Sequence, residues 1–416
     1  MSSLQAENRI YILAGGLGTR LAHLTDNLPK PMASVAGRPF LEWQIESFKA
    51  QGFRDFVLLV GYRKEAIIDH FGDGAGLGVR IEYSVEKELL GTGGAFIQAL
   101  ELFPCETFVL ANGDTYFPVP LVALLARSRA EPDSFWLAAK LMQKPDRYGT
   151  LAVDARGEIL SFREKDPLLG EGFINGGLYC GSASVFGGQS SVRCSMETEL
   201  FPRMLRERRL RCLAFGEPFI DIGIPQDYLL AQTFIPRWHS QEKKRALFVD
   251  RDGVVIEDTG YLSSPEAVHI IPGCLELLRK ARALGYLLIV VTNQAGVAKG
   301  KMTLSDVDRV NRKMQAELAK LGITLDDILV CPYHPDGNVP EYAVSSLDRK
   351  PNPGLVLKAA EKWSLDLEKS IMVGDKDSDV IANTVLRSKI VPGRYELKNT
   401  AAISTFDEIS KLLENS

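Results

Sequence analysis

Short apolar runs typical of buried strands alternate along the chain with stretches that carry an apolar residue every three or four positions. The apolar runs are residues 9–14, 56–60, 108–111, 246–249, 287–291 and 371–373. The clearest helical stretches are residues 41–51, 274–284, 305–321 and 354–363. Gly322 follows the third of these stretches directly and is a typical helix stop. Strands that alternate with amphipathic helices build largely parallel sheets, so we expect an α/β fold of doubly wound sheets.

The alternation is interrupted once, by the polar segment PRWHSQEKKR at residues 236–245. A chain of 416 residues is also longer than one hydrophobic core usually serves. We therefore predict two domains, at residues 9–235 and 246–416, with residues 236–245 as the linker.

Charge and cysteine usage narrow the class of protein. Lys and Arg total 49 against 53 for Asp and Glu, and the two signs are interspersed, so the chain has no basic stripe for nucleic acid and no polybasic patch for a membrane surface. The first residues show no secretion signal, no apolar run approaches about 18 residues, and the six cysteines form no C-x-x-C pair. We expect a cytoplasmic enzyme for small molecules, and leave open whether it forms a homo-oligomer.

A first candidate site follows the strand at residues 9–14, where the chain continues as Gly15-Gly16-Leu17-Gly18-Thr19-Arg20. A glycine-rich turn between a strand and a helix directs several backbone N–H groups at one anion. The turn lacks the Lys-Ser/Thr of a P-loop, and Leu21 stands where a dinucleotide fingerprint needs its third glycine. A tight turn without a ligand would show the same pattern.

Charged residues in restricted positions accompany this turn. Lys30 lies between Pro29 and Pro31, which fix the backbone on both sides of it. Asp114 follows the apolar strand at 108–111, and Asp221 interrupts another apolar run. Carboxylates at strand ends suit a divalent cation that also binds phosphate oxygens, although each aspartate alone fits a turn or a cap.

Seven motifs occur in order in this half: LAGGLGTRL, LPKPM, LGTGGA at 90–95, NGD, FREK at 162–165, NGGLY at 175–179 and FIDIG. Together they resemble the family of nucleotidyltransferases that join a nucleoside triphosphate to a sugar 1-phosphate. The resemblance implies a Rossmann-like, GT-A-like fold that binds the triphosphate through Gly15, Gly16, Gly18 and Arg20. It implies Mg²⁺ on Asp114 and Asp221, and catalytic roles for Arg20 and Lys30. It also implies a sugar-phosphate pocket with Gly93, Glu164, Lys165 and Gly176.

The chemistry of this reaction agrees with the residues present. A sugar 1-phosphate is already an ionised nucleophile, so attack on the α-phosphorus needs no general base. Positioning and charge neutralisation can supply the catalysis. The lack of a Ser/His/Asp or Cys/His arrangement in this half is therefore expected.

A second candidate site begins at Asp250-Arg251-Asp252-Gly253, directly after the strand at 246–249. Side chains two residues apart leave an extended segment in similar directions, so the two carboxylates repel unless a cation or a proton joins them. An anionic nucleophile beside a carboxylic acid that moves a proton suits phosphate-ester chemistry.

The later motifs TNQ at 292–294, RKP at 349–351 and GDK at 374–376, with Asp379, complete a set. The set resembles the haloacid-dehalogenase-type phosphatases, and most closely their branch of heptose 1,7-bisphosphate and histidinol-phosphate phosphatases. The resemblance implies a Rossmannoid domain without a large cap. It implies that Asp250 is the nucleophile, that Asp252 is the acid/base, and that Asp379 supports the metal shell. The implied Mg²⁺ ligands are Asp250, Asp252 through its carbonyl, and Asp375. The implied substrate-binding residues are Asp258, Tyr261, Thr292, Asn293, Gln294, Arg349, Lys350 and Lys376.

One loop departs from this branch. Many of its members bind structural zinc with Cys, His, Cys and Cys, and here Cys331 remains while Tyr333, Ser346 and Asp348 occupy the other positions. His334 is one residue out of place. One thiolate and a displaced histidine cannot close a tetrahedral site, so we predict that zinc is absent.

The two activities complement each other, because a heptose bisphosphatase releases a sugar 1-phosphate and a nucleotidyltransferase consumes one. We expect synthesis of a nucleotide-heptose, with GTP favoured and GDP-D-glycero-α-D-manno-heptose as the product. The alternative is a mannose- or glucose-1-phosphate nucleotidyltransferase fused to a histidinol-phosphate-like or other small-ester phosphatase. A sensor built from inactive domains is a third hypothesis, which the intact Asp114, Asp250 and Asp375 oppose. The residues do not identify the nucleotide base or the anomer.

Overall fold

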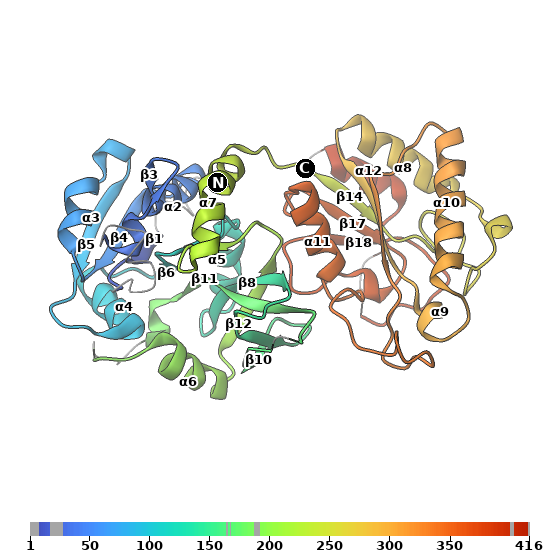
Figure 1. Cartoon of the computed structure of the whole chain (residues 1–416). Helices are drawn as coiled ribbons and strands as arrows, with labels where there is room; N and C mark the ends of the chain where they lie inside the picture. Colours follow the sequence, from blue (N-terminus) through green and yellow to red (C-terminus); the bar gives the residue numbers. More distant parts are fainter. Residues whose placement is uncertain are drawn as a thin grey trace. The chain divides into compact units, whose positions relative to one another are not determined.

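The chain folds as two compact units, Met1–Gln241 and Glu242–Ser416. The computed structural model (Figure 1) describes residues 8–16, 28–163, 165–166, 168–186, 192–399 and 403–414. Each unit has its own sheet and its own helices, which confirms the α/β class.

The first unit is built on a nine-stranded sheet in the order β10-β9-β11-β6-β1-β4-β5, with β8 beside β11 and β12 beside β8. Four neighbouring strands are parallel, namely β6 (Thr107–Asn112), β1 (Arg9–Leu13), β4 (Asp55–Val60) and β5 (Arg80–Val85). Ile10, Tyr11 and Ile12 on the central strand are fully buried, as expected where helices cover both faces of a parallel sheet.

The other half of this sheet is mixed rather than largely parallel. Its strands are β8 (Phe135–Gln143), β9 (Thr150–Val153), β10 (Ile159–Arg163), β11 (Glu171–Ser182) and β12 (Leu210–Phe215). β11 runs antiparallel to β6, β8 and β9, and β9 and β10 form an antiparallel pair. Short connections favour antiparallel neighbours, whereas a parallel pair needs a long crossover.

The helices of the first unit are α2 (Phe40–Ala50), α3 (Lys64–Phe71), α4 (Gly91–Leu102), α5 (Leu121–Ala130), α6 (Phe201–Arg206) and α7 (Pro225–Ser240). The last helix occupies the first half of the segment predicted as a linker at 236–245, because α7 continues through Pro236 to Ser240. Ile235 is fully buried, and Trp238 packs against the apolar cluster around Phe40. These two apolar contacts explain why the helix continues into a segment that is mostly polar.

The second unit has a five-stranded sheet in the order β16-β15-β14-β17-β18, and all its pairs are parallel. The strands are β14 (Ala246–Val249), β15 (Leu287–Asn293), β16 (Asp327–Cys331), β17 (Ile371–Gly374) and β18 (Arg387–Ile390). The helices are α8 (Pro272–Ala283), α9 (Ala295–Ala298), α10 (Leu304–Lys320), α11 (Gly354–Trp363) and α12 (Phe406–Glu414). The carboxyl ends of β14, β15 and β17 meet at one edge, where α/β sheets bind ligands.

Two further observations concern both units. None of the six cysteines takes part in a disulfide. Among the described helices, none combines the length and apolar character needed to span a bilayer.

Candidate active sites

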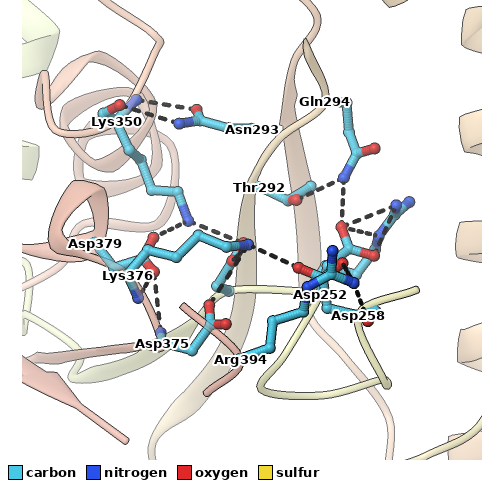
Figure 2. Close-up of polar contacts among 12 residues, drawn as sticks. Asp252, Asp258, Thr292, Asn293, Gln294, Lys350, Asp375, Lys376, Asp379 and Arg394 are labelled. Atoms are coloured by element: carbon cyan, nitrogen blue, oxygen red, sulfur yellow. Dashed lines mark hydrogen bonds and ion pairs between the residues drawn. The ribbon is translucent and has the colours of Figure 1, made fainter. Parts of the chain in front are cut away.

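Three adjacent strands of the second unit deliver the motif residues to one place. Asp250 follows β14, Thr292 is the penultimate residue of β15 and Asp375 follows β17, and all three are buried. The backbone N–H of Asp250 donates to the carbonyl of Val373 at 2.9 Å, which continues the pairing of β14 with β17 beyond the strand end. Figure 2 shows the resulting polar cluster.

Three carboxylates form the centre of this cluster. Asp250, Asp375 and Asp379 each offer an oxygen, and these atoms lie within 4.8 Å of one another. Both buried oxygens of Asp375 lack a hydrogen-bond donor among the described residues. Burial, together with the neighbouring carboxylates, raises the pKa of Asp375 to about 7. Buried oxygens without donors fit a hard cation such as Mg²⁺.

Gly253 is required for the close packing of this cluster. Its φ of +91° is a backbone conformation that side chains disfavour, and a Cβ atom there would overlap the carboxylate of Asp375. The DxDG motif thus ends in glycine because the loop after Asp250 passes directly beside the carboxylate of Asp375, which follows β17.

Two lysines compensate the negative charge. Nζ of Lys350 lies 2.9 Å from Oδ1 of Asp250 and 2.6 Å from Oδ1 of Asp379. Nζ of Lys376 lies 3.2 Å from Asp258, 3.6 Å from Asp375 and 3.9 Å from Asp250. Asn293 fixes the backbone of Lys350, because its side chain both donates to the carbonyl and accepts from the N–H of Lys350 at 3.0 Å.

The carboxylate of Asp252 lies apart from the three clustered carboxylates. Nε2 of Gln294 donates to Oδ2 of Asp252 at 2.7 Å and to the hydroxyl of Thr292 at 2.9 Å (Figure 2). Arg251 contacts both oxygens of Asp252. Burial raises the pKa of Asp252, and the neighbouring Arg251 opposes this shift.

The rim of the site contains residues that sequence analysis missed. Arg394 donates from Nη1 to the carbonyl oxygen of Asp258 at 2.8 Å, and Nζ of Lys376 lies 4.7 Å from the ring centroid of Tyr395. Arg394 and Tyr395 belong to no recognised motif, so no local signal identified them. Tyr261 is about half exposed, with the ammonium of Lys299 over its ring at 5.8 Å.

The loop after β16 is held by protein contacts. The carboxylate of Asp348 accepts from Nζ of Lys358 at 2.6 and 2.7 Å. Arg349 is half-buried and donates from Nη1 to the carbonyl of Tyr333 at 3.2 Å, and burial lowers its pKa. The Tyr333 and Tyr342 rings lie 6.0 Å apart. Among the described residues, no group of three or more metal-ligating side chains gathers around Cys331.

The first unit has a pocket of about 340 Å³ at the end of its parallel strands. Its lining includes four residues expected from the sequence, namely Gly15, Gly16, Lys30 and Asp114. The predicted site residues Gly18, Arg20 and Glu164 lie outside the described residues.

Lys30, Asp114 and Asp221 converge beside this pocket. Nζ of Lys30 lies 3.2 Å from Oδ2 of Asp114. Asp221 pairs with Thr115 between β13 (Ile220–Asp221) and β7 (Thr115–Tyr116), which brings it next to Asp114 in space. A Cβ atom added at Gly223 would lie 2.8 Å from Oδ1 of Asp221, 3.1 Å from Nζ of Lys30 and 3.6 Å from Oδ2 of Asp114. Two carboxylates and a lysine at one point suit Mg²⁺ and phosphate.

Three other expected residues do not line this pocket. Gly93 is buried in α4, where its N–H donates to the carbonyl of Cys194 at 3.0 Å. Gly176 packs against the ring of Phe117, and Lys165 is exposed after β10. The pocket is instead lined in part by Gly91, Thr92, Glu86 and Glu197.

Glu86 could have been found by the same argument as Asp114. It directly follows β5, and its Oε2 accepts from the N–H of Leu90 at 3.0 Å. Burial raises its pKa. Thr92 donates to Glu197 at 2.9 Å, a contact between segments about a hundred residues apart that no local pattern indicates.

Comparisons with known proteins divide the chain in the same way. The nucleotidyl transferase family matches residues 10–237, more than half of the chain, and the polynucleotide kinase 3 phosphatase family matches residues 251–389. The D-glycero-alpha-D-manno-heptose 1-phosphate guanylyltransferase of Campylobacter jejuni is 40% identical over 217 residues, covering 52% of this chain and 95% of that protein.

Two phosphatases match the second unit. The D-glycero-alpha-D-manno-heptose-1,7-bisphosphate 7-phosphatase of Burkholderia mallei is 45% identical over 142 residues, covering 34% of this chain and 75% of that protein. The D-glycero-beta-D-manno-heptose-1,7-bisphosphate 7-phosphatase of Rhodopseudomonas palustris is 38% identical over 158 residues, covering 38% and 86%. Relatives named for both anomers thus match the same unit.

Proposed function

Since the chain belongs to the nucleotidyl transferase family and, through its second unit, to the heptose 1,7-bisphosphate phosphatases, we propose that it is a bifunctional enzyme of nucleotide-heptose synthesis. The phosphatase removes the 7-phosphate of D-glycero-D-manno-heptose 1,7-bisphosphate. The transferase joins the resulting heptose 1-phosphate to a nucleoside triphosphate, with GTP favoured, and releases pyrophosphate. The observation that carries this proposal is the joint presence, in one chain, of the Asp250–Lys350 pair and the Lys30–Asp114 pair.

In the phosphatase, Asp250 attacks the phosphorus of the 7-phosphate and forms an aspartyl phosphate. Asp252 gives a proton to the departing sugar oxygen, and later takes a proton from the water that hydrolyses the aspartyl phosphate. Lys350 and Lys376, both within ion-pair distance of Asp250, neutralise the phosphoryl oxygens. Mg²⁺ held by Asp250 and Asp375 would add charge neutralisation, with Asp379 supporting this shell.

In the transferase, an oxygen of heptose 1-phosphate attacks the α-phosphorus, and the bond to pyrophosphate breaks. No proton has to be removed from the nucleophile. Lys30 neutralises phosphate oxygens, and Asp114 and Asp221 would hold the Mg²⁺ that accompanies the triphosphate. Gly15 and Gly16 border the same pocket and leave room for the phosphates.

We assign the α anomer to the pathway. The product of the phosphatase has to be a substrate of the transferase in the same chain, and the transferase relative is named for the α anomer of the heptose 1-phosphate. The phosphatase relatives are named for either anomer, so they do not distinguish the two, and the assignment rests on the transferase relative.

Product release separates this proposal from its alternatives. Pyrophosphate release is measured for a matrix of nucleoside triphosphates against sugar 1-phosphates, and phosphate release for both heptose bisphosphate anomers and for histidinol phosphate. GTP with α-heptose 1-phosphate, and the α-bisphosphate, should give the highest kcat/KM. A preference for mannose or glucose 1-phosphate together with histidinol phosphate would refute the proposal.

We also propose that the two units, Met1–Gln241 and Glu242–Ser416, act as separate catalytic domains in the cytoplasm. Each domain would bind its own Mg²⁺, and the substrates are small phosphate esters that diffuse freely. Separately expressed domains should each keep their own activity. Loss of one activity on separation would refute independence.

A further inference from the structure

Arg251 is a fully buried cation beside the phosphatase nucleophile. Its side chain has 0% of its surface exposed. Nε donates to Oδ2 of Asp252 and Nη2 donates to Oδ1, both at 3.1 Å. Nη1 donates to Oδ1 of Asn311 on α10 at 2.9 Å. A buried guanidinium is strongly unfavourable unless its charge and its donors are matched, and here the matching charge is the carboxylate of Asp252.

The contacts leave Asp252 little freedom. The two parallel N–H···O contacts from Arg251 form a fork that fixes the plane of the carboxylate. The side-chain amide of Gln294, the residue directly after β15, donates to the same carboxylate at 2.7 Å (Figure 2). A carboxylate without this fork would be attracted by the ammonium groups of Lys350 and Lys376, which lie at the neighbouring cluster.

Asn311 supports the fork from outside the motif. It is buried on α10, a helix whose first turn is fixed by a capping box between Thr303 and Asp306. Its amide oxygen accepts from Nη1, whereas Nε and Nη2 of the guanidinium donate to Asp252. The guanidinium is therefore held between α10 and the carboxylate of Asp252.

We propose that Arg251 and Asn311 are positioning residues that hold the carboxylate of Asp252 in the orientation needed for proton transfer to the departing oxygen. This inference rests on the role proposed for Asp252. It predicts a defect that depends on the leaving group, because an alkoxide needs a proton as it departs and a nitrophenolate does not.

The test compares kcat/KM of the full chain for heptose 1,7-bisphosphate and for p-nitrophenyl phosphate, since kcat/KM includes all steps up to departure of the alcohol. Asn311→Leu should lower the value about tenfold for the sugar ester and less than twofold for the aryl ester. Gln315→Leu, one turn further along α10, is the matched control and should change neither value. Arg251→Lys should show the same selectivity if it folds.

Asp252→Asn separates failure of this inference from failure of the proposed mechanism. If Asp252→Asn shows no dependence on the leaving group, the acid/base role of Asp252 is wrong. The other outcome is that Asp252→Asn lowers kcat/KM more for the sugar ester than for the aryl ester, while Asn311→Leu lowers kcat/KM equally for both esters or for neither. Asn311 is then merely structural, and the inference is overturned.

Discussion

Nζ of Lys350 lies 2.9 Å from Oδ1 of Asp250, the proposed nucleophile. The same ammonium lies 2.6 Å from Oδ1 of Asp379, and only 2% of Lys350 is exposed. Burial lowers the pKa of Lys350, but Asp250 and Asp379 outweigh this effect and raise it, so the side chain is charged. One buried cation therefore both contacts the proposed nucleophile and offsets the repulsion within the carboxylate cluster.

Replacing this cation should damage stability as well as activity. Lys350→Met leaves buried carboxylates uncompensated, so we expect no phosphate release and a loss of about 3–5 kcal/mol in the stability of the second unit without Mg²⁺. Hydrogen exchange of the β14 and β17 amides reports this unit separately. Lys369→Met is the control, because Lys369 forms an exposed pair with Asp366 and should change little. Unchanged exchange in Lys350→Met would contradict the assigned role.

The raised pKa of Asp375 predicts a specific dependence of stability on pH. In the unfolded chain this carboxyl loses its proton near its ordinary pKa of 3.8, whereas the metal-free folded protein keeps it up to about pH 7. Between about pH 4 and about pH 7, unfolding therefore releases a proton from Asp375. The contribution of Asp375 to the free energy of unfolding falls as the pH rises through this range.

Comparison with Asp375→Asn isolates this effect. In Mg²⁺-free buffer, the wild type should lose stability relative to Asp375→Asn between pH 5 and pH 7, as measured by urea unfolding. Mg²⁺ should reduce the difference at pH 8, because the metal needs the ionised carboxylate. Parallel stability profiles of the two proteins would show that Asp375 titrates normally.

The two activities should be separable by single substitutions. Asp250→Asn should abolish phosphate release and leave pyrophosphate release intact. Asp114→Ala should reduce nucleotidyl transfer about 10²–10³-fold and leave phosphate release intact, since it removes charge stabilisation near the phosphates of the other unit. A variant that impairs both activities equally would show that the sites are coupled.

The loop after β16 should be independent of zinc. Elemental analysis should find far less than one zinc per chain, and a zinc chelator should leave the melting temperature unchanged. Stoichiometric zinc would refute this prediction.

The ion pair between Asp348 and Lys358 should stabilise the same loop. Asp348→Asn should destabilise the second unit by about 1 kcal/mol, because it weakens this pair.

Local patterns in the sequence predicted much of the fold. The strands β1, β4, β6, β14, β15 and β17 correspond to continuous apolar runs, which are typical of parallel strands covered on both faces. The antiparallel half of the first sheet was missed, because the direction of a strand depends on its partners and not on its own composition. The end of α7 was missed because most residues from 236 onward are polar. The two apolar contacts, from Ile235 and Trp238, are too few to form a helical pattern in the sequence.

Motifs predicted the members of the phosphatase cluster but not its surroundings. Asp250, Lys350 and Asp375 lie in short motifs at strand ends or in a loop, and the structure brings them together. Arg394 and Asn311 act through contacts with residues distant in sequence, so no spacing rule identifies them. In the transferase pocket, Glu197 was missed for the same reason.

The most direct test of the account supplies the purified single chain with D-glycero-α-D-manno-heptose 1,7-bisphosphate, GTP and Mg²⁺, and follows the products by mass spectrometry. We predict that GDP-heptose forms without another enzyme, together with one phosphate and one pyrophosphate per nucleotide-sugar. When GTP is withheld, heptose 1-phosphate should accumulate, and later addition of GTP should consume it. Removal of the 1-phosphate instead of the 7-phosphate, or failure to transfer the guanylyl group to the released sugar phosphate, would contradict the account.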